Sequence, residues 1–159
     1  MLRIIFIILC VILNKNAFSA DEHYCLAEAI YFEARNQPLI GQKAVGLVVI
    51  NRVKDATFPN TPCKVTRQAK YNNYQPILHK CHFSFYCDGK PERIFNTNAW
   101  TIAKQIAYQI LNNEIYDFTN GSLYYHAVYI QPPQWAKEMR VMIIIDKHIF
   151  YGENKNGQR

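Results

Sequence analysis

The spacing of apolar residues changes along this chain, and that change limits the folds it can adopt. Residues 25–37 and 42–54 place apolar side chains at helical intervals, and residues 97–113 form the clearest amphipathic helix. The later segments 122–130 and 140–151 are instead rich in aromatic and β-branched residues, which favour strands. This order of segments predicts an α+β fold, with about three helices packed on a small antiparallel sheet.

The connections between these segments are marked by proline. Pro38 predicts the end of the first helix, and residues 55–96 hold four prolines and three cysteines. We expect a long irregular region there, and such regions in compact domains usually carry function. The Pro132-Pro133 pair predicts a loop, because proline cannot donate to a sheet ladder. The last segment is expected to be a hairpin that turns near Asp146-Lys147.

The N-terminus has the pattern of an export signal. Arg3 precedes an apolar run over residues 4–13, and Ala17 and Ser19 supply the small residues of a cleavage site. We therefore expect residues 1–20 to be a signal peptide and residues 21–159 to be one exported domain. The alternative is an uncleaved membrane anchor, but the apolar run is short for a transmembrane helix.

In an exported chain the cysteines are expected to form disulfides. The exported chain keeps Cys25, Cys63, Cys81 and Cys87, and an even count in an oxidising compartment indicates two disulfides. Three pairings are possible, of which we favour Cys25–Cys63 and Cys81–Cys87. The histidines beside Cys81 do not complete a known zinc spacing, so we expect no metal and no cofactor.

The charge of the chain indicates an anionic partner. Loss of Arg3 and Lys15 with the signal lowers the formal charge from +6 by two, to +4. Basic residues gather in the central stretch: Lys64, Arg67, Lys70 and Lys80. A bacterial wall, a membrane surface or nucleic acid would each attract them, and export argues against nucleic acid. We expect a monomer without stable membrane insertion once the signal is removed.

One glutamate stands where the first helix should be apolar. With Leu26 at zero on a helical wheel, Ile30 lies at about 40° and Glu33 at about 340°, whereas Glu28 and Arg35 lie on the opposite face. Burial disfavours a charged carboxyl, so the pKa of Glu33 should rise and the group could act as a general acid. The alternative is a structural glutamate neutralised by an arginine such as Arg52.

The chain resembles a known family in an ordered set of motifs. "LAEAIYFEARNQPLIGQKAVGLVVINRV" is followed by "FPNTPCKV", "HFSFYCDGK", "LYYHAVYIQPPQWAK" and "DKHIFY". Together they resemble the SleB-type cell wall hydrolases, the family of the spore-cortex-lytic enzymes, which also occurs in phages. The resemblance runs from about residue 24 to residue 151. It implies a lysozyme-related catalytic domain that cuts peptidoglycan glycan strands, as a lytic transglycosylase with a single glutamate.

The family's motifs assign roles to particular residues. The glutamate of its "EAR" block falls on Glu33, which makes Glu33 the expected catalytic acid. The second acid of the family's "RGEP" is replaced here by Gln37, and the glutamine of its "QFSF" by His82. From their positions in the sequence, we expect five further residues to contact the glycan: Ser84, Phe85, Tyr125, His126 and Trp135. The alternative is a packing role, because Ser84 and Trp135 could belong to packed segments and one of the alternating faces that carry Tyr125 and His126 must face the core.

Two other functions are compatible with the same residues. A water-dependent muramidase would need a second carboxylate, for which Asp88 and Asp117 are the candidates. Asp88-Gly89 has the pattern of a turn and Asp117 lies between the last helix and the sheet, so structural roles are favoured for both. A non-catalytic peptidoglycan-binding module would use the aromatic residues and the basic stretch. The acid on an apolar helix face argues against that module, so we expect an enzyme that cleaves the bond between N-acetylmuramic acid and N-acetylglucosamine.

Overall fold

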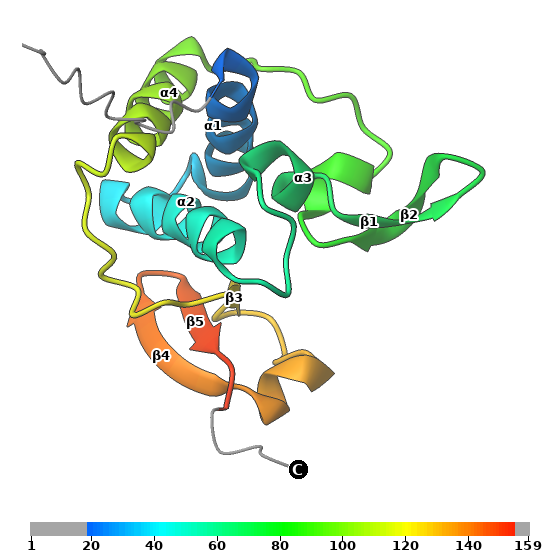
Figure 1. Cartoon of the computed structure of the whole chain (residues 1–159), viewed down its shortest axis with the longest axis vertical. Coiled ribbons are helices and arrows are strands. Elements are labelled where there is room, and N and C mark those ends of the chain that lie inside the picture. The colour runs from blue at the N-terminus through cyan, green and yellow to red at the C-terminus, as the bar shows by residue number, and fades with distance from the viewer. Residues whose placement is uncertain (1–18, 155–159) are drawn as a thin grey trace, which may run out of the picture.

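Three long helices lie over a small sheet in the computed structural model, which describes residues 19–154 (Figure 1). The helices are α1 (Ala20–Ala34), α2 (Leu39–Lys54) and α4 (Thr97–Leu111). The strands β3 (Tyr124–Ala127), β4 (Arg140–Ile145) and β5 (His148–Gly152) form an antiparallel sheet in the order β3-β5-β4. The predicted α+β class is therefore confirmed.

Most of the predicted signal peptide lies outside the described residues. The exceptions are its last two residues: Ser19, whose hydroxyl accepts the backbone N–H of Glu22, and Ala20, which opens α1. Within residues 19–154, no helix is both long and apolar enough to cross a bilayer.

The core forms where the three long helices meet. α1 contributes Leu26 and Ile30, and α4 contributes Ile106 and Ile110, all almost fully buried. Gly46 lies on the face of α2 that meets them, and a Cβ there would lie 2.6 Å from Ile110 Cδ1 and 2.9 Å from Ile30 Cδ1. The missing side chain thus allows α2 to approach both neighbours closely.

The region 55–96 is more regular than its sequence predicts. It contains the short helix α3 (Pro62–Thr66), the hairpin strands β1 (Ala69–Asn72) and β2 (Gln75–Cys81), and the 3₁₀ turn η1 (Ser84–Cys87). The prediction of an irregular segment was wrong here. The hairpin turn uses left-handed Asn73 and Tyr74 in place of a glycine, and the second residue of β2 is Pro76, so the usual hairpin signals are missing.

A second short helix lies in the loop predicted around the double proline. It is the 3₁₀ turn η2 (Gln134–Glu138), and it begins directly after Pro133. Proline suits that position because it precedes the turn and its missing N–H leaves no bond unmade.

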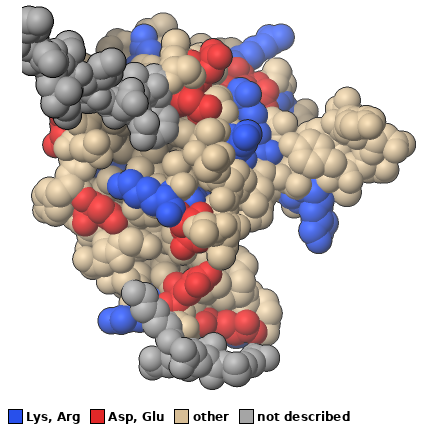
Figure 2. Space-filling model, viewed as in Figure 1, with Lys and Arg blue, Asp and Glu red and all other residues tan. Residues whose placement is uncertain are grey.

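The hairpin β1–β2 projects from the body of the molecule (Figure 1). Figure 2 shows charged side chains of both signs over the helical body, whereas the end of the hairpin is uncharged. Its base is held by the backbone bond from His82 N to Gln68 O, 2.9 Å long, and by the start of η1.

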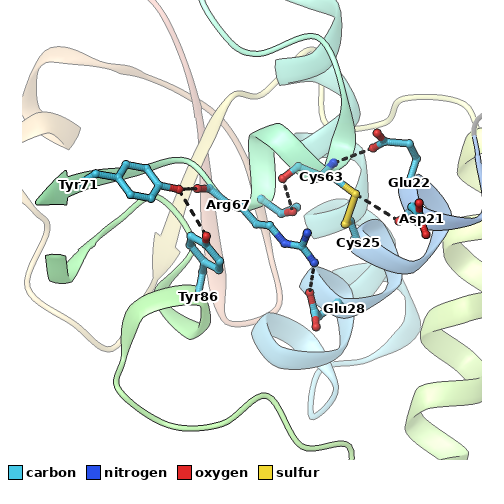
Figure 3. Close-up of polar contacts among 9 residues, drawn as sticks. Asp21, Glu22, Cys25, Glu28, Cys63, Arg67, Tyr71 and Tyr86 are labelled. Carbon is cyan, nitrogen blue, oxygen red and sulfur yellow. Dashed lines mark hydrogen bonds and ion pairs between the residues drawn. A yellow bond between two sulfur atoms is a disulfide. The ribbon is translucent and has the colours of Figure 1, made fainter. Parts of the chain in front are cut away.

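The structure contains both of the disulfides that we favoured from the sequence. Cys25 pairs with Cys63, which ties α1 to α3, and Cys81 pairs with Cys87, which closes the segment between β2 and η1. The first link is reinforced by a hydrogen bond of 2.8 Å from the backbone N–H of Cys63 to a carboxylate oxygen of Glu22 (Figure 3).

One expectation about α1 is wrong. Glu28, which the helical wheel places on the face opposite the core, is only 7% exposed. The reason is that α3 covers this second face of α1, so α1 is enclosed from both sides. Arg67 lies 3.8 Å from the Glu28 carboxylate and supplies its counter-charge (Figure 3).

The pairing predicts the thiol content of residues 21–159. Alkylation of residues 21–159 without a reductant should add no label, because all four cysteines are bonded, and alkylation after reduction should add four labels. Intact-mass spectrometry measures both states. Peptide mapping should then recover the Cys25–Cys63 and Cys81–Cys87 cross-links, and a different pairing or free thiols in the unreduced chain would contradict the structure.

Candidate active site

The carboxyl group of Glu33 is the meeting point of three segments that are distant in sequence. Glu33 lies in the last turn of α1, where its Oε1 accepts a hydrogen bond of 3.3 Å from the Ser84 hydroxyl of η1. Its Oε2 accepts a bond of 3.2 Å from the Tyr125 hydroxyl on β3. Ser84 and Tyr125 were both predicted to lie at the site, and the structure brings them to Glu33.

Burial controls the protonation of this carboxyl. Desolvation raises the pKa of Glu33, and the hydrogen bonds from Tyr125 and Ser84, together with backbone N–H groups at the start of η1, oppose that rise only in part. Burial and the nearby Glu33 carboxylate raise the pKa of Tyr125 well above its ordinary value, so its hydroxyl stays protonated and remains a donor. Glu33 therefore holds its proton at a higher pH than an exposed glutamate does.

Arg52 does not neutralise Glu33 by a direct ion pair. Its side chain is 5% exposed, its Nε donates to the carbonyl oxygen of Leu123 at 2.6 Å, and its guanidinium lies 5.1–5.4 Å from the centres of three aromatic rings: Phe58, Phe83 and Tyr124. Among the described residues, the ion pair within 4.0 Å is Arg67–Glu28. A purely structural role for Glu33 depended on an ion pair with an arginine such as Arg52, and the structure contains no such ion pair within residues 19–154.

A cavity of about 350 Å³ adjoins the acid. Ser84 and Phe85 belong to its lining, and Phe85 stacks on Phe32 with ring centres 5.2 Å apart. Phe95, which is 84% exposed, forms another part of the wall. Charged residues complete the rim: Arg35, Asp88, Lys90, Glu92 and Arg93. A cavity with flat apolar walls and a polar rim suits a ligand that has both kinds of surface.

Two of the predicted ligand-binding residues lie elsewhere. His126 points to the opposite face of β3 from Tyr125, as alternation along a strand requires, and its ring nitrogens bond the Ala127 carbonyl and the Tyr151 hydroxyl. Trp135 packs against His126 and Tyr151, with ring centres 6.0 and 5.5 Å apart. The structure therefore brings Ser84, Phe85 and Tyr125 to Glu33, and places His126 and Trp135 in a separate aromatic cluster.

The two candidate second acids occupy different settings. Asp117 accepts hydrogen bonds from Thr119, Gly121 and Asn51, and these outweigh desolvation to lower its pKa, so it holds the loop before β3. Asp88 accepts the backbone N–H of Lys90 at 2.8 Å in the turn expected for it, yet it also lines the cavity.

Sequence reasoning missed the other residues of α1 that build the cavity. The Tyr31 hydroxyl accepts the backbone N–H groups of Phe95 and Asn96 at 3.2 and 3.0 Å, which fixes the segment that forms the cavity's far wall. Phe32 and Arg35 line the cavity directly. The sequence pattern that could have identified these residues is "YFEAR", in which aromatic and cationic residues lie next to the glutamate.

A family model described as Cell Wall Hydrolase matches residues 36–151. The chain belongs to this cell wall hydrolase family. It is also similar to the spore cortex-lytic enzyme of Bacillus cereus, at 32% identity over 135 residues, which are 85% of this chain and 46% of that protein. The spore cortex-lytic enzyme of Bacillus subtilis is 28% identical over 84% of this chain and 38% of its own length. The chain therefore spans less than half of these curated relatives.

Solved structures of the family match at the level of the catalytic domain. The crystal structure of the catalytic domain of the Bacillus cereus SleB protein aligns with a TM-score of 0.66 and 29% identity, covering 86% of this chain and 94% of that one. The catalytic domain of the germination-specific lytic transglycosylase SleB from Bacillus anthracis aligns with a TM-score of 0.65 and 30% identity, covering 86% and 98%. The family fold expected from the sequence is thus confirmed.

The hydrogen bond from Tyr125 predicts a shift in the titration of Glu33. The hydroxyl stabilises the charged carboxylate, so Tyr125→Phe should raise the pKa of Glu33 further above its ordinary value. NMR titration of labelled glutamate side chains measures the change. Tyr124→Phe is the matched control, because Tyr124 neighbours Tyr125 and makes no hydrogen bond to Glu33. A lower Glu33 pKa in Tyr125→Phe would show that the hydroxyl does not act on the carboxylate.

Proposed function

We propose that this chain cleaves the bond between N-acetylmuramic acid and N-acetylglucosamine in peptidoglycan, as a lytic transglycosylase with Glu33 as its single acid/base. The observation that carries the proposal is the Glu33 carboxyl beside a cavity: desolvation raises its pKa, and the Ser84 and Tyr125 hydroxyls donate to its two oxygens. The family membership and the name of the Bacillus anthracis relative support the same reaction.

The reaction needs one proton donor that later becomes an acceptor. Protonated Glu33 gives its proton to the glycosidic oxygen, and the bond from that oxygen to C1 of the muramic acid breaks. The C6 hydroxyl of the same muramic acid then bonds to C1, and its proton goes to the Glu33 carboxylate. A 1,6-anhydro ring forms, no water is consumed, and Glu33 ends in its starting protonation state.

The hydroxyl donors serve the second half of this cycle. Once Glu33 has lost its proton, the desolvated carboxylate is unfavourable, and the Tyr125 and Ser84 hydroxyls stabilise it until it is protonated again. The Phe32–Phe85 pair and Phe95 offer apolar faces to sugar rings, and the charged rim offers hydrogen bonds to their substituents.

Water-dependent cleavage is the second candidate, because Asp88 and Glu92 line the same cavity as Ser84 and Phe85. A hydrolase places a second carboxylate where it can act on a water or on the anomeric carbon. The Asp88 carboxylate is engaged by the N–H of Lys90, which favours the single-acid route.

The proposed reaction takes place outside the cytoplasm. We propose that residues 1–20 are a cleaved signal and that residues 21–159 work as an exported monomer on the cell wall. The apolar run over residues 4–13 and the two disulfides support export, since disulfides persist in oxidising compartments.

Glu33→Gln separates catalysis from folding. The variant keeps the shape of the side chain but cannot give or regain a proton, so cleavage of purified sacculi should fall by about 10²–10⁴-fold. The free energy of unfolding of this variant should not fall with its activity. Because the folded pKa of Glu33 is raised, its charged form destabilises the fold as pH rises through that pKa, and Gln has no such cost. Denaturant unfolding at neutral pH should therefore show Glu33→Gln at least as stable as the parent chain.

Glu28→Gln is the matched control for that experiment. Glu28 lies on the same helix, is also buried and also has a pKa raised by desolvation, but it faces Arg67 and not the cavity. Its replacement should leave cleavage within a few-fold of the parent. Folded Glu33→Gln protein that clears sacculi at the parental rate would end the proposal for Glu33.

The products distinguish the two reactions. Digestion in ¹⁸O-labelled water should give muropeptides that end in 1,6-anhydro-muramic acid, lighter by one water than hydrolytic products and free of the label. Mass spectrometry reads both properties in one experiment. Products that carry one labelled oxygen at a reducing end would establish the water-dependent reaction, and Asp88→Asn would then be the variant to test for the second carboxylate.

A further inference from the structure

The projecting hairpin β1–β2 carries apolar side chains that the fold does not use. Tyr74 at its turn is 97% exposed, and Tyr71, Leu78 and Ile77 are 51%, 54% and 39% exposed. Free energy would be gained if a partner removed these surfaces from water. Tyr74, Ile77 and Leu78 are here called the hairpin tip, and Figure 2 shows no charged side chain at the far end of the projection.

The turn itself does not explain its aromatic residue. Tyr74 has φ +67° and follows Asn73 at φ +45°, a two-residue turn in which glycine would be favoured at the second position. A tyrosine there costs free energy relative to glycine, and it makes almost no contact with the rest of the chain. The presence of Tyr74 at the end of the hairpin therefore lowers the stability of the turn.

The hairpin is held firmly where it joins the body. The Tyr71 hydroxyl donates to the carbonyl oxygen of Arg67 at 3.0 Å and lies 3.4 Å from the Tyr86 hydroxyl of η1 (Figure 3). The Cys81–Cys87 disulfide fastens the end of β2 to the same turn. A rigid base allows the tip to present its side chains without a large loss of conformational entropy on binding.

The chain segment that contains the hairpin has charged side chains of one sign only. Residues 56–87, which comprise α3, the hairpin and η1, contain Lys64, Arg67, Lys70 and Lys80 and no aspartate or glutamate. Three of these cations are lysines with exposed side chains, and Arg67 is paired with Glu28. The formal net charge of residues 21–159 is +4, which equals the charge of the four basic residues in this one segment.

We propose that the hairpin is a docking element for an anionic lipid bilayer, which it binds reversibly from outside. Apolar side chains at a tip with lysines at its base are the two features that peripheral adsorption requires, because the tip enters the interface while the lysines face the headgroups. Tyrosine suits the headgroup boundary, where its ring is apolar and its hydroxyl remains hydrated.

A glycan strand fits this surface less well. Tyr71 and Tyr74 could stack on sugars, but the exposed aliphatic side chains of Ile77 and Leu78 give a sugar neither a flat face nor a hydrogen bond. None of the residues 69–81 lines the cavity beside Glu33, so a strand bound there need not reach the tip. Docking on a membrane would hold the cleft close to the wall layer next to that membrane.

The experiment is co-sedimentation of residues 19–159 with vesicles. The apolar run over residues 4–13 is omitted because it would bind lipid by itself, and the fold with its core lies within residues 19–154. Vesicles of phosphatidylcholine alone are compared with vesicles of equal parts phosphatidylglycerol and phosphatidylcholine. The protein should bind the anionic vesicles at least tenfold more tightly, and salt should weaken that binding.

Two variants test the two features separately. Tyr74→Ser combined with Leu78→Ser removes apolar surface from the tip, and Lys70→Gln combined with Lys80→Gln removes two positive charges at its base. Each pair should weaken binding to anionic vesicles by about tenfold or more. The matched controls are Tyr116→Ser, which removes another exposed tyrosine, and Lys137→Gln with Lys147→Gln, which removes the same charge elsewhere. Circular dichroism verifies that each variant folds.

The remaining outcomes decide against the proposal. It is overturned if the parent does not bind anionic vesicles, or if the hairpin variants bind them as the controls do. It is also overturned if the hairpin variants lose binding to lipid-free sacculi to the same extent, since the partner would then be the glycan. Glu33→Gln should bind vesicles like the parent, so a failure of the proposed catalytic role leaves this test intact.

Discussion

The enclosure of α1 is the constraint on which the rest of the structure depends. α2 and α4 cover one side of this helix and α3 covers the other, so a helix with two glutamates runs through the interior. Close approach at Gly46 and the Cys25–Cys63 disulfide hold the neighbours in place. Each glutamate must then find a polar partner, and the two find different ones: a cation for Glu28, and hydroxyl groups for Glu33.

The two glutamates differ in their partners and not in the direction of their pKa shift. Desolvation raises the pKa of both carboxyls, and this rise is opposed by the charge of Arg67 at Glu28 and by hydroxyl donors at Glu33. Glu33 also lies at the end of α1 beside a cavity, while Glu28 is covered by α3. Because the pKa of Glu33 is raised, charging this carboxyl costs stability, and the same shift favours the protonated form that the proposed general acid requires.

The segment between α2 and α4 serves both of the activities inferred for the protein. Its last part, η1, places Ser84 and Phe85 at the acid, and Tyr86 of the same turn meets Tyr71 at the base of the hairpin. The Cys81–Cys87 disulfide lies between the two. The turn η1 therefore links the cleft to the projecting hairpin. A membrane that binds the hairpin would also determine where the cleft lies relative to that membrane.

The sequence by itself determined the long elements and pointed to Glu33 as the candidate acid. Periodicity located the three long helices, and aromatic and β-branched residues located the C-terminal strands, because both patterns are local properties of the chain. Periodicity also singled out Glu33, and the "EAR" motif agreed. It could not show that α3 covers Glu28, or that Asn73 and Tyr74 form a turn without glycine. Only tertiary structure decided that Ser84 and Tyr125 meet Glu33 while His126 and Trp135 do not, because such contacts join residues up to 92 positions apart and depend on how whole elements pack.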